Sequence, residues 1–207
     1  MMPATPPLHY LALGDSYTIG ESVPTEARWP AQLVQQLRRS GVVIDDPRIV
    51  AVTGWTTDEL SAAMDQAKLV PTYDLVTLLI GVNDEYRGRP AGDYRPAFAA
   101  LLRRAITLAG HRPQQVIVVS IPDWGTTPFA RNDARGAVRI ADELDVYNAI
   151  ARDEAARAGV HWVNITTISR QHANLVAYDG LHPSAAQYTL WVDAILPRAR
   201  QALRPSR

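Results

Sequence analysis

The sequence contains no cysteine, which excludes disulfides, thiolate nucleophiles and zinc sites built on thiolates. It also has no net charge, because 21 Lys and Arg residues balance 21 Asp and Glu residues. Without excess positive charge no overall field attracts phosphate backbones or anionic lipids, so nucleic acid is not an expected partner. Long apolar runs are missing too. The longest, Leu75 to Val82, contains Thr77 and is far shorter than the roughly 18 residues of a membrane span.

The N-terminal segment lacks the features of a secretory signal. Its first ten residues contain neither Lys nor Arg, and the apolar run from Leu8 to Leu13 is too short for a signal's hydrophobic region. We therefore expect no signal peptide and a soluble, cytoplasmic protein. Because no Gly/Ser-rich linker divides the 207 residues, one domain over residues 1–207 is expected, while the oligomeric state stays open.

Five short apolar runs indicate strands. They are His9–Leu13, Val42–Val52 with a polar interruption, Tyr73–Ile80, Gln115–Ile121 and Val160–Ile165. These runs are rich in Val, Ile and Leu without strict alternation, a pattern typical of parallel strands that are buried on both faces.

Helical patterns lie between these runs. They cover Ala31–Arg39, Thr56–Lys68, Asp93–Ala109, Asp142–Ala158 and a segment after Ser184; the candidate capping residues are Thr56 with Glu59, Asp93, and Ser184 with Gln187. The alternation predicts a three-layer α/β/α fold, with a flavodoxin-like, doubly wound parallel sheet of about five strands. In such folds the site lies beyond the carboxyl ends of the strands.

Polar and glycine residues follow the predicted strands. Gly14-Asp15-Ser16-Tyr17 follows the first, Thr53-Gly54-Trp55 the second and Gly81-Val82-Asn83-Asp84 the third; Asp179-Gly180-Leu181-His182-Pro183 comes later. Ser16, at a strand-to-helix turn, is a candidate nucleophile. His182 is a candidate base because imidazole titrates near neutral pH, and Asp179 is close enough in sequence to orient it.

Three groups are candidate donors to a developing oxyanion: the backbone N–H groups of Ser16 and Gly54, and the side-chain amide of Asn83. Each string taken alone has an ordinary explanation. Ser16 can cap a helix, His182 can be a surface histidine before a helix, and the glycines can end strands or allow turns.

The order and placement of the strings resemble those of the SGNH hydrolases, also called GDSL-type esterases and lipases. Gly14-Asp15-Ser16-Tyr17 matches the first block of that family, with Tyr17 replacing the usual leucine. Gly54, Gly81-Val82-Asn83-Asp84 and Asp179-Gly180-Leu181-His182-Pro183 match the others. The resemblance implies a flavodoxin-like fold, a Ser16, Asp179 and His182 triad, the three donors already named, and no metal.

The expected activity is hydrolysis of a small-molecule ester through an acyl-enzyme, without a cofactor. Short-chain acyl esters, lysophospholipids, acyl thioesters and acetylated sugars are all candidate substrates. An acyltransferase or thioesterase with the same triad, a carbohydrate O-acetylesterase and a non-catalytic binding protein are the alternatives. Four aromatic residues are candidates to line the substrate pocket or to pack: Tyr17, Trp55, Tyr86 and Trp124. The segment Pro122–Gly136 is long enough to cover a substrate, although a solvated loop is the simpler expectation.

Overall fold

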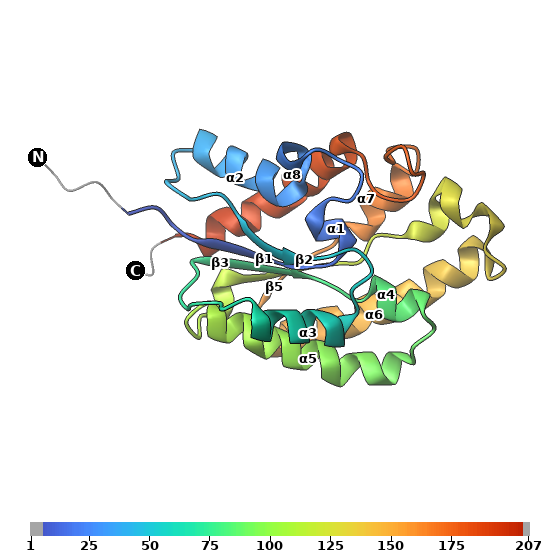
Figure 1. Ribbon diagram of the computed structural model, residues 1–207, viewed down its shortest axis with the longest axis horizontal. Coiled ribbons are helices and arrows are strands. Elements are labelled where there is room, and N and C mark those ends of the chain that lie inside the picture. The colour runs from blue at the N-terminus through green and yellow to red at the C-terminus, as the bar shows by residue number, and fades with distance from the viewer. Residues whose placement is uncertain (1–5, 205–207) are drawn as a thin grey trace, which may run out of the picture.

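The computed structural model describes residues 6–204. Its central layer is a sheet of five parallel strands in the order β2-β1-β3-β4-β5, which confirms the predicted doubly wound, flavodoxin-like fold. The strands are β1 (Tyr10–Gly14), β2 (Arg48–Ala51), β3 (Leu75–Leu79), β4 (Val116–Val119) and β5 (His161–Val163). Figure 1 shows this sheet between two layers of helices.

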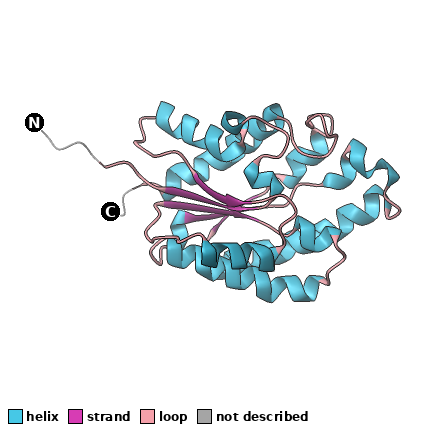
Figure 2. Cartoon of the chain, viewed as in Figure 1, coloured by secondary structure: helices cyan, strands magenta, loops and turns pink. Residues whose placement is uncertain are grey.

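The helices cover both faces of the sheet. On one face lie α2 (Trp29–Arg39), α7 (Thr166–Gln171) and α8 (Ala185–Ala202); on the other lie α3 (Thr57–Gln66), α5 (Ala91–Leu108) and α6 (Gly136–Ala158). Two short helices, α1 (Ser16–Ile19) and α4 (Val82–Tyr86), directly follow strands β1 and β3. In Figure 2 the strands occupy only the middle layer. Within residues 6–204, no helix combines the length and apolar character needed to cross a membrane.

The observed strands are shorter than the apolar runs that predicted them. β1, β3 and β4 are buried along their whole length, as expected for strands covered by helices on both faces. The largest difference concerns the run Val42–Val52, of which only Arg48–Ala51 forms β2. Ile44 makes only an isolated bridge to Leu8, and the residues on either side of it belong to no helix, strand or turn.

The starts of α5 and α6 differ from the prediction, whereas α8 begins directly after Ser184 as expected. Asp93 does not cap α5, because the helix begins at Ala91 directly after Pro90, and Asp93 lies in its first turn. α6 begins at Gly136 rather than Asp142, and no side-chain capping signal marks that start. At α8, Ser184 accepts a hydrogen bond from the Gln187 N–H.

The capping box predicted for α8 is not formed. The Gln187 side-chain amide instead donates to the backbone carbonyls of His172 (3.3 Å) and Leu175 (2.8 Å), which joins α8 to the segment after α7. The capping box of α3 forms as predicted. Thr56 donates its backbone N–H to the Glu59 carboxylate over 2.9 Å, and both halves of the motif are present.

The register of the central strands brings three loops to one edge of the sheet. Gly14, the last residue of β1, is paired with Ala51 of β2 and with Leu79 of β3. All three strands therefore end at the same level, and the segments that follow them emerge side by side. The strand order also reverses at this point, since β2 and β3 lie on opposite sides of β1, which is where open α/β sheets form a crevice.

Candidate functional site

Ser16 is fixed by the tight turn between β1 and α1. A side chain at position 14 would overlap the Thr18 hydroxyl and come within 2.6 Å of the Leu79 carbonyl oxygen, so only glycine fits there. Asp15 caps α1, and its Oδ1 accepts the Tyr17 N–H over 3.0 Å. Ser16 is the first residue of this helix, so its own N–H has no intrahelical acceptor and is free for a ligand.

The loop that carries Gly54 is tied to α4. The Asn83 side-chain amide donates to the Trp55 carbonyl over 2.9 Å, which uses one amide hydrogen and leaves the other available. The Asp84 carboxylate accepts the backbone N–H (3.0 Å) and the hydroxyl (2.9 Å) of Thr57. These contacts hold the ends of β2 and β3 in a fixed relation.

Glycine is also required before α4. Gly81 has a φ of 128°, and a Cβ there would come within 2.7 Å of the Tyr94 ring. The Tyr94 hydroxyl donates to the Ile80 carbonyl over 2.9 Å, so the ring itself is held in place. Asn83 therefore enters the site from a backbone with little freedom to shift.

A cavity of about 170 Å³ opens at this edge of the sheet. Its polar lining residues are Ser16, Thr53, Asn83 and His182, together with the backbone at Gly54. Its apolar and aromatic lining residues are Tyr17, Val82, Tyr86, Trp124, Phe129 and Leu181. Segments that are distant in the sequence thus bring a hydroxyl, an imidazole, an amide and a glycine backbone to one cavity.

His182 is held from behind by Asp179. The imidazole Nδ1 lies 2.7 Å from Asp179 Oδ2, which leaves Nε2 as the ring nitrogen without this partner. Asp179 Oδ1 accepts the backbone N–H groups of Leu181 (2.9 Å) and His182 (3.0 Å). Burial raises the pKa of Asp179, but hydrogen bonds from the Ser22 hydroxyl, these backbone groups and His182 outweigh it and bring the pKa to about 2. The carboxylate is therefore ionised at neutral pH.

Tyr17 packs against the His182 ring. The two ring centroids are 5.6 Å apart with planes tilted by 59°, and Tyr17 also lies 6.2 Å from Trp191. Tyr17 is buried, and burial raises the pKa of its phenol well above the usual value, so the side chain is neutral. It therefore supports one face of the imidazole through packing.

The Asp15 carboxyl next to Ser16 is fully buried. Within the described residues its Oδ2 has no hydrogen-bond partner. Burial raises the pKa of Asp15 to about 7, against the opposing effect of the Tyr17 N–H. A protonated carboxyl group is therefore part of the turn below that pH.

The aromatic wall of the cavity is formed around Trp124, which is buried. Its indole N–H donates to Glu85 Oε2 over 2.9 Å, and Glu85 Oε1 pairs with Arg135 Nη1 at 2.6 Å. The Arg135 guanidinium lies 5.0 Å from the Trp124 ring centroid and 5.9 Å from that of Tyr86. Burial raises the pKa of Glu85 to about 7, while the Trp124 N–H and the Arg135 charge favour its ionised form.

Comparison with known proteins now identifies the family, because its sequence model matches residues 12–190. The chain belongs to the GDSL-like Lipase/Acylhydrolase family. This GDSL-like chain is 30% identical over 120 residues to an arylesterase from Vibrio mimicus. That match covers 56% of this chain and 56% of the arylesterase, so the chain spans about half the length of this curated relative.

Two solved structures illustrate the shared fold. A lipase/acylhydrolase from Enterococcus faecalis superimposes with a TM-score of 0.74 at 19% identity, covering 97% of the GDSL-like chain and 99% of its own. An acetylxylan esterase from Geobacillus stearothermophilus has a TM-score of 0.71 at 17% identity, covering 96% and 97%. At these identities the likeness concerns the fold.

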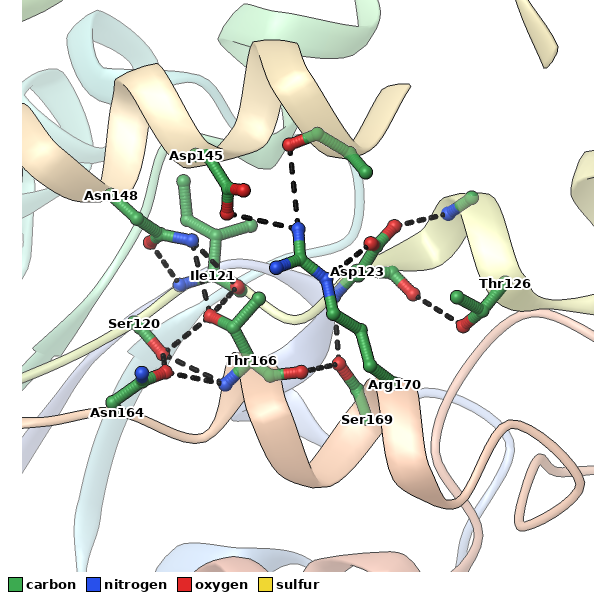
Figure 3. Close-up of polar contacts among 12 residues, drawn as sticks. Ser120, Ile121, Asp123, Thr126, Asp145, Asn148, Asn164, Thr166, Ser169 and Arg170 are labelled. Atoms are coloured by element: carbon green, nitrogen blue, oxygen red, sulfur yellow. Dashed lines mark hydrogen bonds and ion pairs between the residues drawn. The ribbon is translucent and has the colours of Figure 1, made fainter. Parts of the chain in front are cut away.

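A polar network ties the segment of the GDSL-like chain that includes Ile121 and Asp123 to α6 and α7 (Figure 3). Asn148 of α6 accepts the Ile121 N–H (2.8 Å) through its side-chain oxygen and donates to the Ile121 carbonyl (3.1 Å). Asp123 accepts a hydrogen bond from Arg170 Nε of α7 over 2.7 Å, and its backbone N–H donates to the Ser169 hydroxyl over 2.8 Å. The backbone just before Trp124 is thus hydrogen-bonded by two helices.

The segment 122–136 is consequently not the solvated loop that was the simpler expectation. It contains the 3₁₀ helices η3 (Trp124–Thr126) and η4 (Pro128–Asn132), and its first part is buried. The Phe129 N–H donates to the Gly180 carbonyl over 3.0 Å, so this segment also contacts the turn that carries His182. It forms a structured wall because its polar groups find partners on α6 and α7.

The structure brings most of the predicted site residues together. Ser16, Gly54, Asn83 and His182 line the cavity with Tyr17, Tyr86 and Trp124, and Asp179 lies behind His182. The Trp55 side chain is not among the lining residues of the described chain; it packs against the core and only its carbonyl contacts Asn83. Sequence reasoning missed Ser22, Glu85 and Arg135, whose partners are far away in the sequence.

Proposed function

We propose that this chain is a serine esterase that hydrolyses carboxylic esters through an acyl-enzyme on Ser16. The observation that carries this proposal is the shared cavity: Ser16, Asn83 and His182 line it, and the His182 Nδ1 to Asp179 Oδ2 distance is 2.7 Å. A hydroxyl, an imidazole oriented by a carboxylate, and unpaired N–H donors are together the requirements of acyl transfer.

In the first step, Ser16 Oγ attacks the ester carbonyl carbon while His182 Nε2 accepts the hydroxyl proton. The negative charge that develops on the carbonyl oxygen is stabilised by the Ser16 and Gly54 N–H groups and the second amide hydrogen of Asn83. Asp179 stabilises the imidazolium that forms. The bond to the leaving alkoxide then breaks, His182 returns its proton to that oxygen, and the alcohol departs.

In the second step, water attacks the acyl-enzyme. His182 accepts one proton from the water, the same donors stabilise the second oxyanion, and the bond to Ser16 Oγ breaks as the oxygen regains its proton. A carboxylic acid leaves, and the enzyme returns to its starting state. Besides the substrate and this water, the proposed cycle uses the side chains and backbone groups named above.

The size of the cavity favours small acyl groups. We expect a cavity of about 170 Å³ to suit an acetyl to butyryl ester group better than a long acyl chain. The aromatic wall around Trp124 supplies an apolar surface for that group. We therefore expect turnover of p-nitrophenyl esters to fall beyond butyrate, with discrimination of about 1 to 3 kcal/mol per methylene at most.

The central test compares wild type with Ser16→Ala on p-nitrophenyl acetate and butyrate. The variant is expected to lose at least about 10³-fold in rate, because the acyl-enzyme cannot form. Ser40→Ala, at an exposed serine after α2, is the matched control and should keep full activity. Equal turnover by Ser16→Ala and wild type would rule out Ser16 as nucleophile. Product analysis with added alcohol distinguishes hydrolysis from acyl transfer, since a transferase would form the new ester in preference to the acid.

A further inference from the structure

Ser22 adopts an unusual backbone conformation just after α1. Its φ of 66° lies in the left-handed region, which glycine adopts readily but serine does not. In the described chain only Lys68 and His111 share this property among residues other than glycine. A strained residue persists where its surroundings require it, so the contacts of its side chain indicate its role.

The Ser22 hydroxyl donates to Asp179 Oδ2 over 2.6 Å. This oxygen is the one that lies 2.7 Å from His182 Nδ1. The other oxygen, Oδ1, accepts the N–H groups of Leu181 and His182. A carboxylate has about four acceptor positions, so Ser22 occupies the last of them and completes the fixation of the group.

The turn around Ser22 is also tied to the other parts of the site. The N–H groups of Gly20 and Glu21 both donate to the Ser16 carbonyl over 3.0 Å. The Thr53 hydroxyl donates to the Glu21 carboxylate, next to Gly54. Residues 20–22 thus connect the α1 turn, the Gly54 loop and the Asp179 turn, three segments that are distant in the sequence.

We propose that Ser22 is a positioning residue that fixes the Asp179 carboxylate and, through it, the orientation of the His182 ring. The inference rests on the proposed function, because it assigns Ser22 to the same reaction. Glycine would fit the backbone conformation at position 22 better, but it has no hydroxyl to donate to Asp179. This requirement explains why a serine stands there. Ser22 contacts Asp179 rather than the cavity, so its effect is on the reaction step and not on substrate binding.

The first experiment separates the hydroxyl from the backbone conformation. Ser22→Gly and Ser22→Ala both remove the hydroxyl, but only glycine adopts the positive φ without strain, so Ser22→Gly should melt at or above the temperature of Ser22→Ala. Both variants are expected to lose about tenfold in kcat with KM unchanged. A loss of this size corresponds to the free energy of one hydrogen bond to a charged group. A fully active Ser22→Gly would overturn the proposal, since a residue that only shapes the turn is replaced by glycine without loss.

Lys68→Gly is the matched control, because Lys68 has a φ of 46° and lies after α3, outside the cavity lining. It relieves the same kind of backbone strain and should leave kcat unchanged. A tenfold fall in kcat for this control would attribute the effect at Ser22 to backbone changes in general, and would overturn its assignment.

The second experiment tests whether Ser22 acts through Asp179. In a double-mutant cycle, Ser22→Ala should cost about tenfold in the wild-type background and nothing in the Asp179→Ala background. Equal costs in both backgrounds, with Ser16→Ala inactive, would overturn the role of Ser22 and leave the esterase proposal standing. If Ser16→Ala were as active as wild type, both proposals would fall together.

Discussion

The two sides of the cavity are built by different means. The side with Ser16, Gly54 and Asn83 is placed by the ends of three paired strands and by backbone turns that require glycine. The side with Trp124 depends on side-chain charges. One of its supports is the Glu85–Arg135 ion pair, whose members are 50 positions apart in the sequence. A similar bond between Asp123 and Arg170 spans 47 positions. The comparison teaches that sheet geometry fixes the polar groups, while ion pairs shape the apolar wall.

The largest expected effect comes from the sheet side. Asn83→Ala removes one of the three proposed oxyanion donors and should lower kcat by about 10²- to 10³-fold with little change in KM. Steady-state kinetics on p-nitrophenyl acetate measures both parameters. Asn174→Ala, at an exposed asparagine outside the cavity lining, is the control and should be unchanged. A raised KM with normal kcat would mean that Asn83 binds the ground state instead.

The next effect tests the wall side. Arg135→Met leaves the buried Glu85 carboxylate without its ion-pair partner and should lower the free energy of unfolding by about 3 kcal/mol at about pH 8. The loss should shrink at about pH 5, because Glu85, with a pKa that burial raises to about 7, can then take a proton. We expect KM to rise while kcat is largely kept. Denaturant unfolding at the two pH values measures the stability difference.

Arg139→Met provides the control for this prediction. The Arg139 side chain is 69% exposed and pairs with Glu143 one helical turn away. Its loss should cost no more than about 0.5 kcal/mol. If the two arginine variants lost the same stability, the buried pair would have no special part in holding the wall.

The last prediction concerns the buried carboxyl on the sheet side, and its effect builds up gradually with pH. Burial raises the pKa of Asp15 to about 7, above its unfolded value. The folded state then binds more protons between these two values, so wild-type stability falls as pH rises through about 4 to 7. Asp15→Asn keeps an oxygen for the Tyr17 N–H and removes the titration. As the pH rises through that window, the free energy of unfolding of the variant should increase relative to that of wild type by on the order of 1 kcal/mol per pH unit.

Thermal unfolding of both proteins across this pH range checks the prediction. The difference between them isolates Asp15, because the other titrating groups are shared. Parallel curves for wild type and Asp15→Asn would show that Asp15 does not titrate there. The stability of the turn that carries Ser16 would then be independent of the protonation of Asp15.

The same contrast explains what the sequence could predict. The parallel strands and the polar groups at their ends were predicted from apolar runs and short polar strings, because both are local patterns. The flavodoxin-like strand order was instead predicted from the alternation of strands and helices along the whole chain. The start of α6 at Gly136 has no such local signal. Glu85 and Arg135 look like ordinary surface charges in the sequence, and their pairing arises only when α4 and the segment before α6 pack together. Ser22 is hidden for the same reason, since its partner Asp179 is 157 positions away.

The burial of β1 and β3 on both faces has a consequence for the time scale on which the site can change. Their amide hydrogens are shielded from solvent and bonded to neighbouring strands, so they should exchange with deuterium only when the whole molecule unfolds. Ser16 and Asn83 follow these two strands within a few residues. The spacing between the backbones of Ser16 and Asn83 should therefore persist for as long as the molecule stays folded.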